Sequence, residues 1–235
     1  VVPSEPRSSV AFAAKELQTY IKKISGAELP IYPPFAVDNG KGERLAQQYP
    51  PDLKRLPLKI YVGNSYHTDR LGVTDDGLDW GAYRIKSGKD WLALLGKDTS
   101  FTPMGIWGRS RGHMNRGAKE EWEKAIGDHH WSNPMRKIWI NYSRDLDMWA
   151  YDQKGTVYAV YGFLRRLGVR WYMPGELGQI VPEKKTIELP DLDETVVPDV
   201  KIRDLNWAKF AFTSPAAQEQ VLWAMRLGAN LPFRY

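Results

Sequence analysis

Two adjacent histidines, His129 and His130, follow Asp128 and most directly suggest a metal site. Imidazole and carboxylate groups are ordinary zinc ligands, but a zinc site needs three or four ligands that converge on one point. Neighbouring side chains diverge, and the HExxH pattern does not occur in this sequence. We therefore interpret the cluster as part of a surface loop, and we expect neither a metal nor a cofactor.

Acidic residues in pairs could hydrolyse a glycosidic bond, because that reaction uses two carboxyl groups about 5 to 9 Å apart. Glu120, Glu121 and Glu123 are close in sequence, but they fit the exposed face of a short helix around 118–126. Asp145 and Asp147 would share one side of an extended segment, and nothing else distinguishes them. We assign no catalytic residue in this chain.

Other catalytic patterns are missing from the sequence as well. The segment GIWGRSRG lacks the GxxxxGK[ST] order of a phosphate-binding loop, and neither GxSxG nor SxxK occurs. There is no cysteine, which excludes thiolate catalysis and disulfides. The net charge of +5 comes from scattered basic pairs, so we expect no nucleic-acid partner. No apolar run approaches the roughly 18 residues of a membrane helix, so we expect no membrane partner either.

Aromatic residues are the unusual feature of the composition, with ten tryptophans and twelve tyrosines. Such flat side chains either fill a core or stack on ligands such as sugar rings. Residues 99–154 have little regular periodicity and contain Trp107, Trp122, Trp131, Trp139 and Trp149. Because structureless loops of that length are uncommon, we predict a small ordered lobe over this range.

Three helices are predicted from apolar periodicity. The first begins with Ser8 or Ser9 as the cap and ends near Ser25, before Gly26. A second stripe covers 157–167, with Thr156 as a candidate cap and Gly168 as the terminator. The third covers about 215–227.

Alternating residues predict the strands that these helices cover. Residues 58–62 form one strand, and 83–86 with 91–95 form a hairpin that turns at 87–89. Further strands are predicted at 28–35, 169–174, 186–189 and 201–212, with 191–199 as a connector. Helices lying against one mixed sheet make an α+β domain.

Four sequence stretches occur in the order of one known kind of domain: AAKELQTYIKKISGAELPI, KIYVGNS, WLALLGKD and KGTVYAVYGFLRRLGVRWYMPGELGQIVP. This order resembles the non-catalytic N-terminal domain of bacterial β-N-acetylhexosaminidases and α-glucuronidases, and most closely that of their uncharacterised relatives. The resemblance covers roughly 1–98 and 155–200. It implies a mixed sheet with two helices on one face, similar in outline to zinc peptidases but without their metal site.

The resemblance also implies that 1–198 is an accessory domain with the lobe 99–154 inserted, and that 199–235 begins a truncated (β/α)₈ catalytic barrel. In hexosaminidases an arginine at the start of the first barrel strand binds sugar hydroxyls, and Arg203 stands at the matching position. Asp204 follows where those enzymes usually have glycine. Together with Trp207, these two residues are the candidates for substrate binding.

We therefore expect a non-catalytic accessory domain of a bacterial glycoside hydrolase, whose partners are carbohydrate and the catalytic barrel of the same parent chain. The chain alone is expected to be inactive, because the carboxylates of such enzymes come from later barrel strands. An extracytoplasmic location, periplasmic or secreted, goes with this function. The alternative is a stand-alone carbohydrate-binding module that uses the Trp-rich lobe.

Overall fold

The computed structural model describes residues 1–32, 55–100, 142–143, 146–149, 152–201, 203 and 215–230. The chain divides into two compact units, the first made of 1–99 with 153–201 and the second of 100–152 with 202–235. The first unit contains a four-stranded mixed sheet and is the larger described part. Each unit is described by itself below.

The sheet of the first unit has the strand order β1-β3-β2-β10. Strand β1 (Lys59–Val62) runs parallel to β3 (Trp91–Gly96), which pairs antiparallel with β2 (Tyr83–Gly88). Strand β10 (Asp193–Val196) pairs antiparallel with β2 at the other edge. The predicted hairpin of β2 and β3 is confirmed, and it supplies the two central strands of the sheet.

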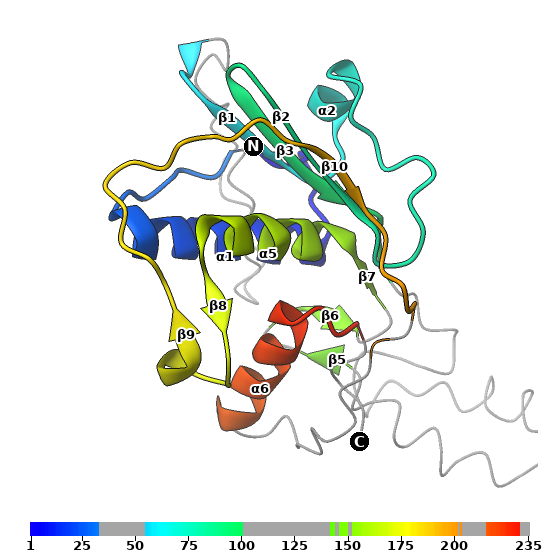
Figure 1. Cartoon of the computed structure of the whole chain (residues 1–235). Helices are drawn as coiled ribbons and strands as arrows, with labels where there is room; N and C mark the ends of the chain where they lie inside the picture. Colours follow the sequence, from blue (N-terminus) through cyan, green and yellow to red (C-terminus); the bar gives the residue numbers. More distant parts are fainter. Residues whose placement is uncertain are drawn as a thin grey trace, which may run out of the picture. The chain divides into compact units, whose positions relative to one another are not determined.

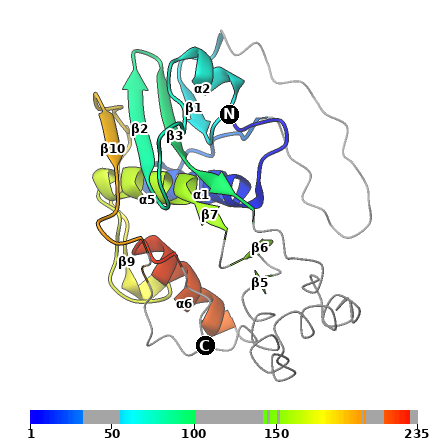
Figure 2. The same cartoon turned by 90° about the vertical axis from the view of Figure 1, so that its right-hand side faces the viewer.

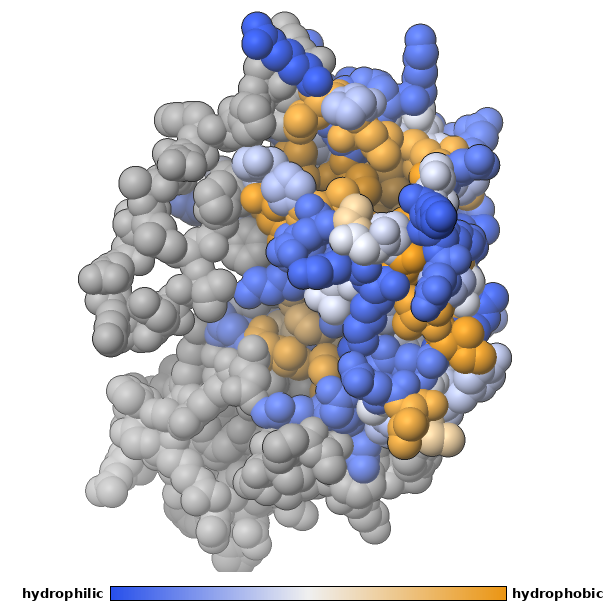
Figure 3. All heavy atoms as spheres, turned by 90° about the vertical axis from the view of Figure 1, so that its left-hand side faces the viewer, coloured by the Kyte–Doolittle hydropathy of each residue, from blue (hydrophilic) through white to orange (hydrophobic). Residues whose placement is uncertain are grey.

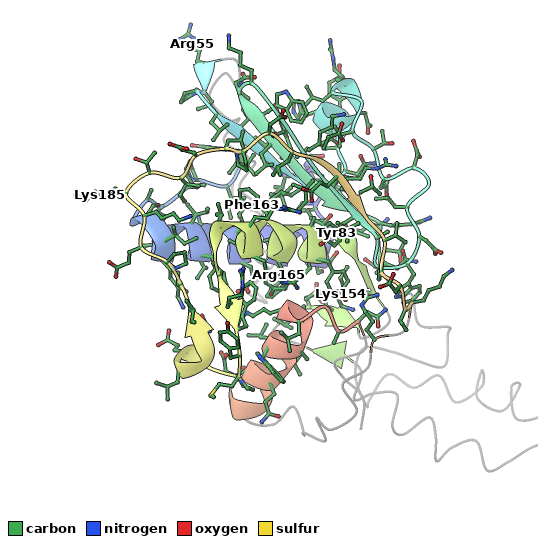
Figure 4. All side chains as sticks on the ribbon, viewed as in Figure 1. Arg55, Tyr83, Lys154, Phe163, Arg165 and Lys185 are labelled. Atoms are coloured by element: carbon green, nitrogen blue, oxygen red, sulfur yellow. The ribbon has the colours of Figure 1, made fainter. Side chains whose placement is uncertain are left out.

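Helices α1 (Ser8–Ser25) and α5 (Gly155–Leu167) lie side by side against one face of this sheet (Figures 1 and 2). Both carry a continuous buried stripe; in α5 nearly every residue is buried. Helix α5 comes close to β2 because Gly162 has no side chain: a Cβ atom there would lie 2.7 Å from the hydroxyl of Tyr83. Tyr83 lies between α5 and the sheet (Figure 4).

The other sheet face is covered by α2 (Tyr66–Arg70) and the segment that follows it (Figure 1). A second apolar core lies here, made of Tyr61, Val73, Leu78, Ala82, Ala93 and Leu95. Arg84 on β2 donates to the backbone oxygens of Thr74 and Asp76, which holds the covering segment over the sheet. Both faces of β1 and β3 are therefore buried, which explains the near-continuous apolar run of β3.

Helices α1 and α5 end as predicted but begin differently. Gly26 and Gly168 adopt left-handed conformations, with φ of +78° and +103°, at the C-termini of α1 and α5. The predicted serine and threonine caps are wrong: Arg7 precedes α1 and Lys154 precedes α5, without side-chain cap hydrogen bonds. Ser9 and Thr156 instead point their hydroxyls at one carboxyl group, that of Asp98.

Two strand predictions are also corrected by the structure. Residues 186–189 are not a strand, whereas Asp193–Val196, within the predicted connector, pairs with β2 as β10. Charged pairs select this register, since Glu194 binds Arg166 of α5 and Asp193 binds Lys86 across the strands. The described part of 28–35 contains no strand; Tyr32 accepts a single backbone hydrogen bond from Val2.

A short ladder joins the sheet to α5. Strand β4 (Asp98–Thr99) pairs antiparallel with β7 (Gln153–Lys154), and the amide of Gly155 donates to the carbonyl of Lys97 at 3.1 Å. Gly96 and Gly155 are in backbone contact, since a Cβ atom on Gly155 would lie 2.5 Å from the nitrogen of Lys97. The start of α5 therefore has no room for a side chain.

The remaining described elements lie partly in the first unit and partly in the second. Strands β8 (Arg170–Trp171) and β9 (Gln179–Ile180) form a hairpin in the first unit, with the 3₁₀ turn η4 (Glu176–Gly178) at its end. The second unit contains the pair β5 (Tyr142–Ser143) and β6 (Met148–Trp149) and helix α6 (Pro215–Arg226), which confirms the predicted C-terminal helix. Gly228 follows α6 with φ of +95°.

The predicted mixed α+β class is confirmed. Within the described ranges no barrel closes, and the zinc-peptidase outline, the inserted lobe and the barrel start remain predictions. No helix in the described part of the chain is both long and apolar enough to cross a membrane.

Replacing Gly155 by alanine tests the backbone contact at the start of α5. The new Cβ atom would overlap the nitrogen of Lys97 and the carbonyl oxygen of Ala82, so we expect a loss of about 3 kcal/mol in the free energy of unfolding. Gly26→Ala is the control, because Gly26 has open space around it and suffers only the left-handed backbone penalty of about 1 kcal/mol. Urea denaturation followed by circular dichroism measures both; equal losses would contradict the close contact.

Candidate functional site

Arg203, the first substrate-binding candidate, holds the end of a helix in the second unit. Its Nε donates to the carbonyl oxygen of Gly228 at 2.6 Å, and its backbone nitrogen donates to Oδ1 of Asn230 at 2.8 Å. The carbonyl of Gly228 lies just past the C-terminus of α6, where a cation is electrostatically favourable. These contacts give Arg203 a structural role at the end of α6.

The other two candidates, Asp204 and Trp207, lie outside the described residues. The same holds for the histidine pair, for Glu120 to Glu123 and for most of the Trp-rich segment. Asp147 is described: it adopts φ of +47° in the turn between β5 and β6, which accounts for an aspartate there. Among the described residues no three His, Asp or Glu side chains are grouped to hold a metal.

Trp171 explains why the segment after α5 is rich in aromatic residues. Its indole Nε1 donates to the hydroxyl of Tyr20 on α1 at 2.7 Å, and that hydroxyl donates to Oε1 of Gln179 at 3.0 Å. The rings of Tyr20 and Trp171 meet edge to face with centroids 5.5 Å apart. A buried chain of hydrogen bonds therefore ties both strands of the β8–β9 hairpin to α1.

Helix α5 holds the same tryptophan from its other side. The ring of Tyr161 lies 5.4 Å from that of Trp171, and the Tyr161 hydroxyl donates to Glu16 on α1 at 2.8 Å. Tyr158, Tyr161 and Trp171 are all buried, so these three aromatic side chains pack in the core. The base of the hairpin is therefore rigid.

In contrast to its buried base, the tip of the hairpin exposes apolar side chains to solvent. Four large apolar side chains of residues 172–180 are more than half exposed: Tyr172, Met173, Leu177 and Ile180. Leu177 is 99% exposed on the 3₁₀ turn, a position where an apolar side chain gains nothing from burial in this unit. On the side of the molecule where the hairpin lies, apolar residues reach the surface among hydrophilic ones (Figure 3).

Few charges accompany this apolar tip. Glu176 forms an exposed ion pair with Lys23 of α1, with 3.5 Å between Nζ and Oε1. Such a pair contributes little to stability, because water screens both partners. A rigid base with an exposed apolar tip can bury area against another surface at a small entropic cost. We call residues 172–180 the hairpin tip and regard it as the candidate interaction site.

A second polar cluster, which the sequence patterns do not reveal, lies inside the first unit. The carboxyl group of Asp98 accepts hydrogen bonds from Ser9 Oγ at 3.1 Å, from the backbone nitrogen of Thr156 at 3.3 Å, and from Thr156 Oγ1. Burial of this carboxyl group raises the pKa of Asp98 from 3.8 to about 7, although the three donors oppose the shift. The sequence contains one indication of this cluster: Asp98 follows closely after the predicted strand 91–95.

A comparison of the chain with models of known protein families, with curated proteins and with solved structures finds no match. The function is therefore argued from the residues of this chain.

Replacing Tyr20 by phenylalanine tests the anchoring of the hairpin. The indole N–H of Trp171 would lose its buried acceptor, so we expect a loss of about 2 kcal/mol in the free energy of unfolding. Tyr172→Phe is the matched control, because Tyr172 is 67% exposed and its change should stay within about 0.5 kcal/mol. If urea denaturation gave equal effects for the two variants, the anchoring role of Tyr20 would be wrong.

Proposed function

We propose that residues 1–198 are the non-catalytic accessory domain of a bacterial glycoside hydrolase, which packs against and supports the catalytic barrel of the same parent chain. The order of sequence motifs described above motivates this function. The hairpin tip is the structural observation that supports it. An extracytoplasmic location and a carbohydrate substrate belong to the same proposal.

The hairpin tip has the properties of a domain–domain contact. Single exposed apolar residues are normal on protein surfaces, whereas a group of them held at one place favours an interaction site. Trp171 and Gln179 anchor the hairpin to α1, so the apolar side chains are presented without a further ordering step. In the family that this chain resembles, the RWYMPGE segment lies near the junction with the barrel.

The chemistry in this proposal belongs to the barrel. Hydrolysis of a glycosidic bond needs one carboxylic acid to protonate the leaving oxygen and a second carboxylate to attack the sugar or to activate water. We assign neither group to this chain. Arg203 Nε donates to the carbonyl of Gly228, so any contact of Arg203 with a sugar would use its other guanidinium N–H groups. The proposal therefore gives 1–198 a supporting role.

The alternative function, a stand-alone carbohydrate-binding module, depends on the tryptophans of 99–154. Most of that range lies outside the described residues. No described contact favours the module over the accessory domain, so it remains a prediction.

Leu177→Asp tests whether the hairpin tip is a domain–domain contact. In the present chain we expect the melting temperature to change by no more than about 1 °C, because Leu177 is 99% exposed. In the full-length parent protein the same change would place a charge in an apolar interface. The melting temperature of the accessory domain should therefore fall by at least about 3 °C. Tyr66→Asp is the control, since Tyr66 is 68% exposed on α2, which covers the opposite sheet face.

Differential scanning calorimetry of the full-length protein measures these shifts, and equal effects of Leu177→Asp and Tyr66→Asp would contradict the contact. The hydrolase assignment is tested separately with aryl glycosides of N-acetylglucosamine and with glucuronic-acid-substituted oligosaccharides. We expect hydrolysis by the full-length protein and none by residues 1–201. A full-length protein without a barrel, or hydrolysis by 1–201 alone, would overturn the proposal.

A further inference from the structure

Residues 100–152 leave the first unit and return to it through one short ladder. Asp98 pairs with Lys154 and Thr99 with Gln153, and directly behind them Gly155 donates to the carbonyl of Lys97. We call this ladder, residues 96–99 and 153–156, the neck. Because two backbone pairs are a weak connection by themselves, side chains must supply part of what holds the neck closed.

The carboxyl group of Asp98 is the point where the neck meets both helices. Oδ1 accepts from Ser9 near the start of α1 and from the backbone of Thr156 in the first turn of α5, while Oδ2 accepts from the Thr156 hydroxyl. The same hydroxyl accepts from the amide of Gly96 at 3.1 Å, at the end of β3. The carboxyl group of Asp98 and the Thr156 hydroxyl therefore together join α1, the sheet, the neck and α5.

This carboxyl group has no ion-pair partner in the described structure. Helices α1 and α5 face it with Ser9 and Thr156, which are neutral, and the nearby carboxylate of Asp75 repels a negative charge there. On the neck itself, Lys97 is exposed and Lys154 lies opposite Asp98 in the ladder, at the junction of β7 and α5 (Figure 4). Neither lysine forms an ion pair with Asp98 in the described structure.

We propose that the Asp98 carboxyl group makes the neck pH-sensitive: the neutral acid keeps the attachment of residues 100–152 closed, and the ionised acid lets it open more often. The three hydrogen bonds that Asp98 accepts favour the ionised form, and burial outweighs them. The neutral form also fits the site if the bond between Oδ2 and Thr156 reverses its direction. Oδ1 already accepts two hydrogen bonds, so the proton would sit on Oδ2 and face Thr156 Oγ1. This inference does not depend on the proposed glycosidase function.

The direction of the effect follows from proton linkage. Burial raises the pKa of Asp98 to about 7 in the closed neck, whereas an open neck would restore a value near 3.8. The closed neck therefore binds the proton more strongly, and the stability that this gives is complete below about pH 4 and is lost as the pH rises through 7. Within that window each pH unit should favour opening by about tenfold.

Asp98→Asn removes the charge and keeps the hydrogen-bond pattern. The amide oxygen can accept from Ser9 and from the Thr156 backbone, and the amide nitrogen can donate to Thr156 Oγ1, as the protonated acid would. The asparagine variant should thus resemble the neutral acid at every pH. Replacing Ser9 is a second way to change the same group. Ser9→Ala removes a donor to the carboxylate, so it raises the pKa of Asp98 further.

Amide hydrogen exchange of the present chain, corrected for the pH dependence of chemical exchange, is measured at pH 5 and pH 8. We expect protection of the Gly96, Gly155 and Thr156 amides to fall at least tenfold between these values in the original chain, and by less than threefold in Asp98→Asn. Equal falls in both proteins would overturn the proposal.

A second variant keeps the test decisive if Asp98→Asn does not fold. In Ser9→Ala the pH at which protection falls should move upward by at least half a unit, while Ser25→Ala, at the far end of α1, should leave it unchanged. An unchanged midpoint in Ser9→Ala would overturn the proposal, because the Ser9 hydroxyl would then have no influence on the group that titrates.

Discussion

The backbone contact between the end of β3 and the start of α5 is the constraint on which the rest of the first unit depends. Gly96 and Gly155 approach so closely that neither position tolerates a side chain. This contact fixes where α5 begins, and it brings Thr156 within hydrogen-bond reach of Gly96 and Asp98. Helix α1 joins the same point through Ser9, so one small polar cluster sets the position of both helices under the sheet.

The placement of the helices in turn determines what the unit can present to a partner. Because α1 and α5 lie side by side, Tyr20 and Tyr161 meet Trp171 between them and hold the β8–β9 hairpin from two sides. The hairpin tip then exposes apolar side chains on a rigid base. A chain of buried contacts thus connects the start of α5 to the surface that we propose for docking of the barrel.

Apolar periodicity was sufficient to predict α1, α5, α6 and the central hairpin, because each of these elements buries one face or both; the short helix α2 was not predicted. The sequence of strand β10, DETV, has no alternation of apolar and polar residues, so it gives no strand signal. The ion pairs of Asp193 with Lys86 and of Glu194 with Arg166 form only in the folded structure. The polar cluster was missed for the same reason: Ser9, Asp98 and Thr156 are far apart in sequence. Of the predicted binding residues, Arg203 alone is described, and its contacts with Gly228 and Asn230 are local to α6.

The most direct test of the polar cluster is the stability of Thr156→Val, which keeps the shape of the side chain and removes its hydroxyl. The buried amide of Gly96 would lose its acceptor and Asp98 would lose a donor. We predict a loss of about 2 to 3 kcal/mol in the free energy of unfolding at pH 7, measured by urea denaturation. A loss below about 0.5 kcal/mol, the range of ordinary surface substitutions, would contradict the account.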